Sequence, residues 1–217
     1  DLLSWMRRRA PGFFDVVTYE GTKVLGRQLP HNLGVKPDMA WVKCTSKPGG
    51  WVVMMSSPDT GFLRLDTANK LDETLGPAFE MDDTNLTFSN ATHLGNLNND
   101  YTDYIAYLWA SVPGICDFGS FTTTVDGLDI DCGFTTGARF VLIKQTNNTG
   151  YWTYFDTLRG ITSSSSPMLS LNENRAEVAG SYIKPISSGF TVTPNFTTLG
   201  GSSPGTAGEE YIYMAIA

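Results

Sequence analysis

The chain has 217 residues, with 15 Lys and Arg against 22 Asp and Glu, and a formal net charge of −7. Hydrophobic residues make up 41% and charged residues only 17%, which excludes a disordered chain and allows a full core. The acidic balance argues against nucleic-acid binding, because that class of protein presents a basic face to phosphates. The longest apolar run, residues 104–112, is about half the length of a membrane-spanning helix. We therefore expect no membrane insertion, and the start of the chain does not resemble a signal peptide.

Residues 1–12 contain a tryptophan and one short basic run. The residues concerned are Trp5, Arg7, Arg8 and Arg9. We predict an N-terminal arm whose basic residues form a solvated face or contact a neighbouring chain. In an architectural protein this arm would be the segment that docks during assembly.

Three cysteines, Cys44, Cys116 and Cys132, are far apart in the sequence, and no CxxC pair occurs. His31 and His93 are the only histidines. A zinc site needs four clustered ligands and a thiol enzyme needs a base beside its nucleophile, so neither is favoured. Cys44 follows an apolar run and is predicted to be a buried thiol, whereas the redox state of the other two stays open.

From the N-terminus onward, short β-rich runs alternate with clusters of Gly, Pro, Asn, Asp and Ser. Helical periodicity is nearly absent, and the best helical segment, residues 68–75, is short and polar. The predicted strands cover residues 14–19, 39–43, 51–55, 61–65, 86–89, 104–109, 118–124, 140–144, 152–155, 168–171, 182–185, 189–193 and 211–216. This pattern predicts an all-β fold, an antiparallel β-sandwich of the jelly-roll or concanavalin-like kind.

An internal repeat of about 100 residues is the most informative feature of the sequence. Residues 33–43 resemble residues 134–144, and a tryptophan, Trp51 or Trp152, follows each segment at the same spacing. We predict two similar halves, residues 13–112 and 113–217, whose apolar faces cover one another in a single β-sandwich domain over residues 13–217. The closing strands of the halves, 104–109 and 211–216, are apolar nearly throughout, which predicts central strands covered on both faces.

The strings 13–21, 31–37, 140–144, 152–159 and 211–215 together resemble an uncharacterised module of virion proteins in tailed phages, especially marine ones. The similarity spans essentially the whole chain, including the entry at Ser4-Trp5. The resemblance implies a concanavalin-like or laminin-G-like sandwich with a structural or adhesive role at the phage surface. One departure is the stretch 52–55, Val-Val-Met-Met, where the module carries Tyr or His a few residues after its tryptophan.

Several loops combine aromatic residues with Asn and Arg, the side chains that stack on a sugar ring and bind its hydroxyls. Turns also require Asn and Gly for backbone reasons, so each loop alone has a structural explanation. The candidate ligand-binding residues are Asn99, Tyr101, Asn147, Asn148, Tyr151 and Arg175.

Acidic residues at Asp126, Asp129 and Asp131 offer oxygen ligands, so Ca²⁺ is a candidate at this loop, although no cofactor is expected otherwise. The Asp129–Asp131 spacing also puts two carboxylates on one strand face, as a glycosidase would need. Turn residues around the pair favour an ordinary acidic loop. His31 precedes a turn signal and is predicted to be a turn or core position rather than a catalytic base.

The resemblance implies an extracellular phage particle, and together with the loop composition it predicts a non-enzymatic surface module that attaches to a bacterial surface glycan, for example in a tail fibre. Its partners would be other virion proteins and copies of itself, for instance in a trimer. Two alternatives stay open. The first is a purely structural decoration protein of capsid or tail, and the second is a polysaccharide-degrading enzyme on a jelly roll.

Overall fold

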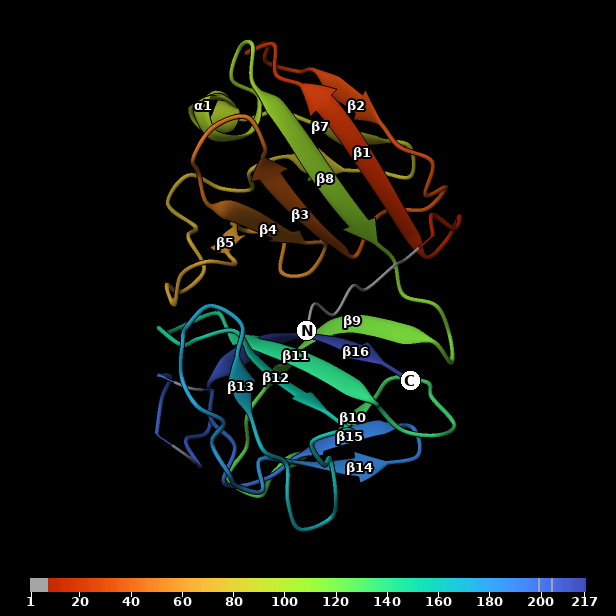
Figure 1. The fold of residues 1–217 in the computed structure, drawn as a ribbon, viewed down its shortest axis with the longest axis vertical. Helices are drawn as coiled ribbons and strands as arrows, with labels where there is room; N and C mark the ends of the chain where they lie inside the picture. The colour runs from red at the N-terminus through yellow and green to blue at the C-terminus, as the bar shows by residue number, and fades with distance from the viewer. Residues whose placement is uncertain (1–7, 199, 204) are drawn as a thin grey trace.

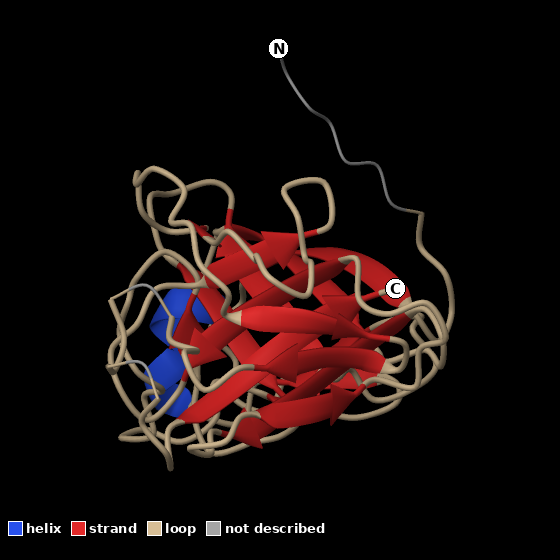
Figure 2. Cartoon of the chain, turned by 90° about the horizontal axis from the view of Figure 1, so that it is seen from below, coloured by secondary structure: helices blue, strands red, loops and turns tan. Residues whose placement is uncertain are grey.

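The structure is a computed structural model that describes residues 8–198, 200–203 and 205–217. In the N-terminal half the elements are β1 (Phe14–Glu20), β2 (Gln28–Pro30), β3 (Met39–Cys44), β4 (Trp51–Met55), β5 (Leu63–Arg64), β6 (Glu80–Met81), β7 (Asn85–Thr87), the 3-10 turn η1 (Ala91–His93), α1 (Leu94–Leu97) and β8 (Asp103–Trp109). In the C-terminal half they are β9 (Cys116–Thr122), β10 (Leu128–Asp131), β11 (Phe140–Gln145), β12 (Thr153–Asp156), β13 (Leu169–Ser170), β14 (Ile183–Ile186), β15 (Gly189–Val192) and β16 (Glu210–Ile216). Figure 2 shows the strands gathered centrally, with loops around them and the helical turns at one side. None of the helices in the described ranges is long and apolar enough to span a bilayer.

The two halves share one topology. The first half has a five-stranded sheet in the order β1-β8-β3-β4-β5 and a three-stranded sheet in the order β2-β7-β6. The second half repeats both sheets as β9-β16-β11-β12-β13 and β10-β15-β14, and all the paired strands are antiparallel. Every strand of one half therefore has a counterpart in the other (Figure 1). The predicted all-β antiparallel fold with two similar halves is confirmed.

Each half is itself a small two-layered sandwich, and a third core joins the two halves. One core lies within each half, and a middle core combines residues of both five-stranded sheets. The five-stranded sheets contribute to two cores because alternate side chains of a strand point to opposite faces. In β3, Ala40 and Val42 face the first core, whereas Met39 and Trp41 face the middle core. The closing strands β8 and β16 lie inside their sheets and contribute to cores on both faces, as their apolar sequences predict.

The segment at residues 64–71 binds the first half to the second. The carbonyl of Arg64 accepts a hydrogen bond from the Trp152 indole at 2.9 Å, and the carbonyl of Ala68 accepts one from Gly150 N–H at 2.9 Å. The Leu71 N–H donates to the carbonyl of Thr146 at 2.8 Å. These polar contacts run along the edge of the middle core and fix the two halves against each other.

One sequence-based expectation was wrong. Residues 128–131, expected to be an acidic loop, form β10, because Leu128–Asp131 pairs antiparallel with β15. The segment 68–75 contains no helix, as its short and polar sequence indicates, and its backbone bonds to the second half and to Phe62.

Candidate binding pocket

A pocket of about 220 Å³ lies at one end of the N-terminal half, between the β3–β4 turn and the loop from α1 to β8. Figure 1 shows α1 beside the start of β8. The pocket is bounded by the end of β3, the β3–β4 turn, β4, β5 and the loop from α1 to β8. The lining residues are Cys44, Lys47, Pro48, Gly49, Gly50, Val52, Arg64, Asn96, Asn99, Thr102 and Tyr104. The volume is below the usual range for drug-sized ligands and suits a small polar ligand about the size of one sugar ring.

Hydrogen bonds across the pocket hold its polar groups in place. Lys47 Nζ donates to Thr102 Oγ1 at 2.9 Å, which ties the β3–β4 turn to the loop before β8. The Asn99 N–H donates to the Tyr104 hydroxyl oxygen at 3.2 Å. Burial raises the pKa of Tyr104, so its hydroxyl keeps its proton at neutral pH.

The loop that carries Asn99 is fixed from behind by its neighbour Asn98, which is fully buried. Asn98 Oδ1 accepts hydrogen bonds from Thr22 N–H (3.0 Å) and from Arg27 Nη1 (2.7 Å). Gly21 packs so closely against this loop that a β-carbon there would clash with the carbonyl of Asn99. The lining is therefore preformed rather than dependent on a ligand for its shape.

The same place in the C-terminal half is filled. Gln145 occupies the register position of Cys44, since these two residues lie opposite Tyr211 and Tyr104, and it is 0% exposed. Its amide nitrogen donates to Ser202 Oγ (2.9 Å) and to Glu209 Oε2 (2.5 Å). The Gln145 side chain and the loop before β16 thus close a site that stays open in the first half.

The structure brings only part of the predicted ligand-binding set to this pocket. Asn99 lines it, and Tyr101 stands on the same loop with 86% of its surface exposed. The other four lie in the C-terminal half. Tyr151 is covered there by the guanidinium of Arg175, 5.8 Å from the ring centre, and by Gly200.

Asn147 and Asn148 use their side chains to hold loops of the second half together. Asn147 Oδ1 accepts from Glu210 N–H at 3.2 Å, and Asn148 Nδ2 donates to Ser202 Oγ at 3.3 Å. Both residues are exposed. The six candidates therefore divide between two places and do not form one site.

The predicted metal residues are not gathered into a cluster. Asp129 and Asp131 are exposed on β10, and Asp129 Oδ1 accepts a hydrogen bond from Thr191 Oγ1 at 2.6 Å. Asp126 lies in the preceding turn. Within the described ranges, no group of three His, Cys, Asp or Glu residues is placed to hold a metal ion.

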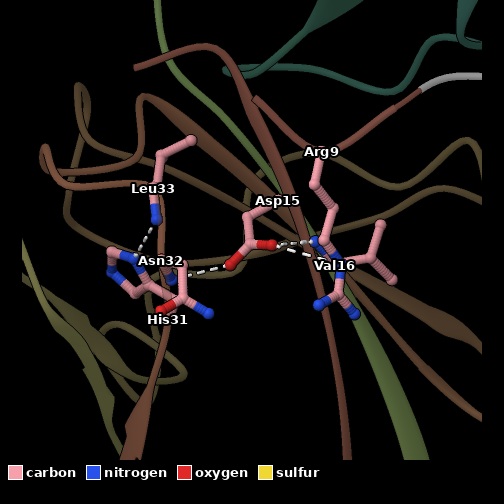
Figure 3. A network of polar contacts seen from close by, with 6 residues as sticks. All are labelled: Arg9, Asp15, Val16, His31, Asn32 and Leu33. Carbon is pink, nitrogen blue, oxygen red and sulfur yellow. Dashed lines mark hydrogen bonds and ion pairs between the residues drawn. The ribbon is translucent and has the colours of Figure 1, made fainter. Parts of the chain in front are cut away.

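The predicted arm is only partly described. Trp5 and Arg7 lie outside the described residues, and Arg8 is exposed. Arg9 Nε lies 3.4 Å from Asp15 Oδ1, so the described end of the arm is attached to the first half (Figure 3).

His31 has a structural role, as the sequence predicts. Its Nδ1 accepts a hydrogen bond from Leu33 N–H (3.3 Å), which places the ring proton on Nε2, opposite the carbonyl of Asp82 at 3.1 Å. The neighbouring Asp15 is nearly fully buried and accepts hydrogen bonds from the N–H groups of Val16 (2.9 Å) and Asn32 (2.7 Å) (Figure 3). Both side chains therefore hold the turn before β3.

The buried thiols are unsuited to nucleophilic chemistry. Burial and the neighbouring Asp117 carboxylate raise the pKa of Cys132 to about 12. Asp117 also accepts a hydrogen bond from the Tyr213 hydroxyl at 2.5 Å. Cys116 is buried as well, and its thiol donates to the carbonyl of Ala110 at 3.3 Å. Cys44 differs from both, because it is half-buried and lines the pocket.

Residues 8–217 match the model of a family described as a domain of unknown function, DUF7483. The chain belongs to the DUF7483 family. No curated protein and no solved structure matches it. The family match covers both halves of the repeat, so the pocket and its closed counterpart both lie within the DUF7483 domain.

Among the polar lining residues of this DUF7483 pocket that sequence analysis missed are Lys47, Arg64 and Asn96. They come from a turn, a two-residue strand and a helical turn that are distant in sequence. A position-by-position comparison of the halves contained a usable signal, because Lys47 corresponds to Asn148 and Arg64 to Ser170.

Proposed function

We propose that this DUF7483 chain is a non-enzymatic module of a phage virion surface, and that it binds a bacterial surface glycan through the pocket of its N-terminal half. The virion setting rests on the sequence resemblance. The binding role rests on one observation: an open, polar pocket exists in one half at the place that Gln145 fills in the other.

Sugar binding suits this pocket because its lining offers amides, hydroxyls and cationic groups at fixed positions. Asn96, Asn99 and Thr102 supply groups that hydrogen-bond to sugar hydroxyls. The exposed Tyr101 ring on the same loop is an apolar plane of the kind on which a second sugar residue stacks. A pocket that is open to solvent can bind one sugar residue while the rest of the polysaccharide chain extends outside it.

A glycosidase would need two carboxylates facing each other across a cleft. Asp129 and Asp131 instead lie two residues apart on the exposed strand β10, and the pocket lining contains no carboxylate within the described ranges. These placements favour binding over hydrolysis. A purely structural decoration protein is the remaining alternative, and it gives no reason for a preformed polar pocket.

Equilibrium binding of the purified chain to a panel of immobilised bacterial lipopolysaccharides and capsular polysaccharides tests the proposal. We expect saturable binding to at least one polysaccharide, without any shortening of the polysaccharide chain. Measuring in calcium and in chelator shows whether an ion takes part, and we expect no difference.

The other outcomes separate the alternatives. Chain shortening would show that the module is an enzyme. Absence of binding across the panel, by a sample with a cooperative unfolding transition, would contradict the glycan role and favour structural decoration.

A further inference from the structure

We infer that the pocket of the N-terminal half recognises an acidic saccharide, binding its carboxylate or sulfate group between Lys47 and Arg64. This inference rests on the proposed function and specifies its ligand. It comes from the charges of the lining, the hydrogen-bonding groups left unused there, and the comparison of the two halves.

The lining is cationic although the chain is acidic. Lys47 and Arg64 are the charged residues of the lining, and no Asp or Glu of the described residues lines the pocket, whereas the whole chain has a net charge of −7. A site for a neutral sugar needs acceptors for the sugar's hydroxyl protons, and carboxylates commonly supply them. A lining rich in donors and without carboxylates matches an anion instead.

Neither cation is paired with a carboxylate in the described part of the chain. Lys47 Nζ donates to the neutral Thr102 hydroxyl, which leaves two of its three protons available. The Arg64 guanidinium lies 5.7 Å from the centre of the Phe62 ring. The Asp66 carboxylate lies beside Gly50, as does the Arg64 guanidinium, but the two form no ion pair, and Asp66 Oδ1 accepts a hydrogen bond from Trp51 N–H at 2.9 Å.

Tyr104 provides an uncharged donor at the same place. Its oxygen accepts a hydrogen bond from Asn99 N–H, and no acceptor for its own proton is found among the described residues. The side chain is 2% exposed, and Tyr104 lines the pocket. A buried phenol with an unused proton favours an acceptor-rich ligand group such as a carboxylate.

The repeat supplies an internal comparison. Where the first half has Lys47 and Arg64, the second half has Asn148 and Ser170. Glu209 occupies the closed site there and accepts a hydrogen bond from Gln145. Both cations thus occur in the half with the open pocket, and a carboxylate occurs in the half without it.

Titration with methyl β-D-glucuronide and with methyl β-D-glucoside tests the inference, because the two compounds differ at a single carboxylate. Amide chemical shifts of the isotope-labelled full chain report binding, and the rate at which Cys44 is alkylated reports occupancy of the pocket. We expect saturable shifts at residues 96–104 and slower alkylation with the glucuronide. We expect at least tenfold weaker binding of the glucoside, since a hydrogen bond to a charged group is worth about 1.5–3 kcal/mol.

Lys47→Gln removes one cation from an exposed side chain, so the fold is expected to survive. We expect this variant to bind the glucuronide roughly 10- to 100-fold more weakly. Lys184→Gln is the matched control, because it removes an equal charge from an exposed position on β14 of the other half and should leave the affinity unchanged. Binding by the wild type should also weaken as salt is raised.

Equal affinity for the glucuronide and the glucoside would contradict the preference for an acidic sugar, although the pocket would still be a sugar-binding site. Equal loss in Lys47→Gln and Lys184→Gln would show attraction to net charge rather than to this site. If the chain bound a polysaccharide of the panel but neither glycoside, this pocket would not be the glycan site, although the glycan role would stand. Absence of polysaccharide binding would overturn the proposed function itself.

Discussion

Replacing Trp152 by alanine is expected to lower the free energy of unfolding by about 3–5 kcal/mol, the usual cost of removing a large buried aromatic side chain. Trp152 is 1% exposed and belongs to the middle core between the five-stranded sheets. Its indole also donates to the Arg64 carbonyl of the other half, so the substitution leaves that acceptor without its partner. Urea unfolding followed by circular dichroism measures the loss.

The repeat provides the control for this substitution. Trp51 is the counterpart of Trp152, but it is only half-buried and its ring stacks on Tyr107 at 6.0 Å. Trp51→Ala should therefore cost less than half as much. Equal losses for the two variants would show that the middle core does not join the halves as described.

Lys144→Met is expected to raise stability at low pH and to change its pH dependence. Lys144 is 0% exposed, and its Nζ contacts the carbonyl oxygens of Gln145 (2.6 Å) and Ala68 (3.5 Å) rather than a carboxylate. Burial lowers the pKa of this amine to about 7. Below pH 7 the folded protein must therefore hold an unpaired buried charge, which methionine would not carry.

The sign of the pH effect follows from proton counts. Between pH 7 and 10.5 the unfolded chain keeps the Lys144 proton that the folded chain has lost, so stability increases with pH. We expect the advantage of Lys144→Met over the wild type to shrink by about 3 kcal/mol from pH 6 to pH 9. Above pH 9 the raised pKa of Cys132 acts in the opposite direction, because the unfolded thiol loses its proton first.

Lys43→Met is the matched control, since Lys43 is the counterpart of Lys144 in β3 and its Nζ donates to the carbonyl of Gly49 near the surface. This variant therefore removes a lysine from the equivalent strand without removing a buried amine. If the difference in unfolding free energy between Lys144→Met and the wild type stayed constant from pH 6 to pH 9, the claim that burial lowers the pKa of the Lys144 amine would be contradicted.

The longer strands could be predicted from the sequence because their apolar residues face two cores at once. Three short strands, β2, β6 and β10, could not. Each contributes one well-buried residue, Leu29, Met81 or Ile130, among exposed neighbours. Strands β2 and β10 take their extended form from pairing with β7 and β15, which are distant in sequence, whereas β6 pairs with β7 across a turn of three residues. Local composition carries no signal of these pairings.

The layering also depends on tertiary packing. Lys43 and Lys144 end similar strands, so the sequence gives no reason to expect different surroundings. Only Lys144 becomes buried, and the carbonyl of Ala68 in the segment 64–71 lies beside its amine. The two halves are similar in topology but not in how they cover each other.

The pocket could be predicted only in part. Loop composition identified Asn99, because Asn-rich turns present amides to solvent. Lys47 and Arg64 reach the same cavity through strand pairing, which no single segment reveals. The comparison of Cys44 with Gln145 is the clearest sign of the pocket, and it becomes interpretable once their shared register is known.

The central claim is that the open place in the first half binds the glycan, and Cys44→Gln tests it most directly. This substitution puts into the first half the residue that fills the second. Affinity for the polysaccharide that binds the wild type is measured for the wild type, Cys44→Gln and the space-conserving control Cys44→Ser. We predict at least a tenfold loss for Cys44→Gln and little change for Cys44→Ser. Wild-type affinity in a folded Cys44→Gln variant would contradict the account.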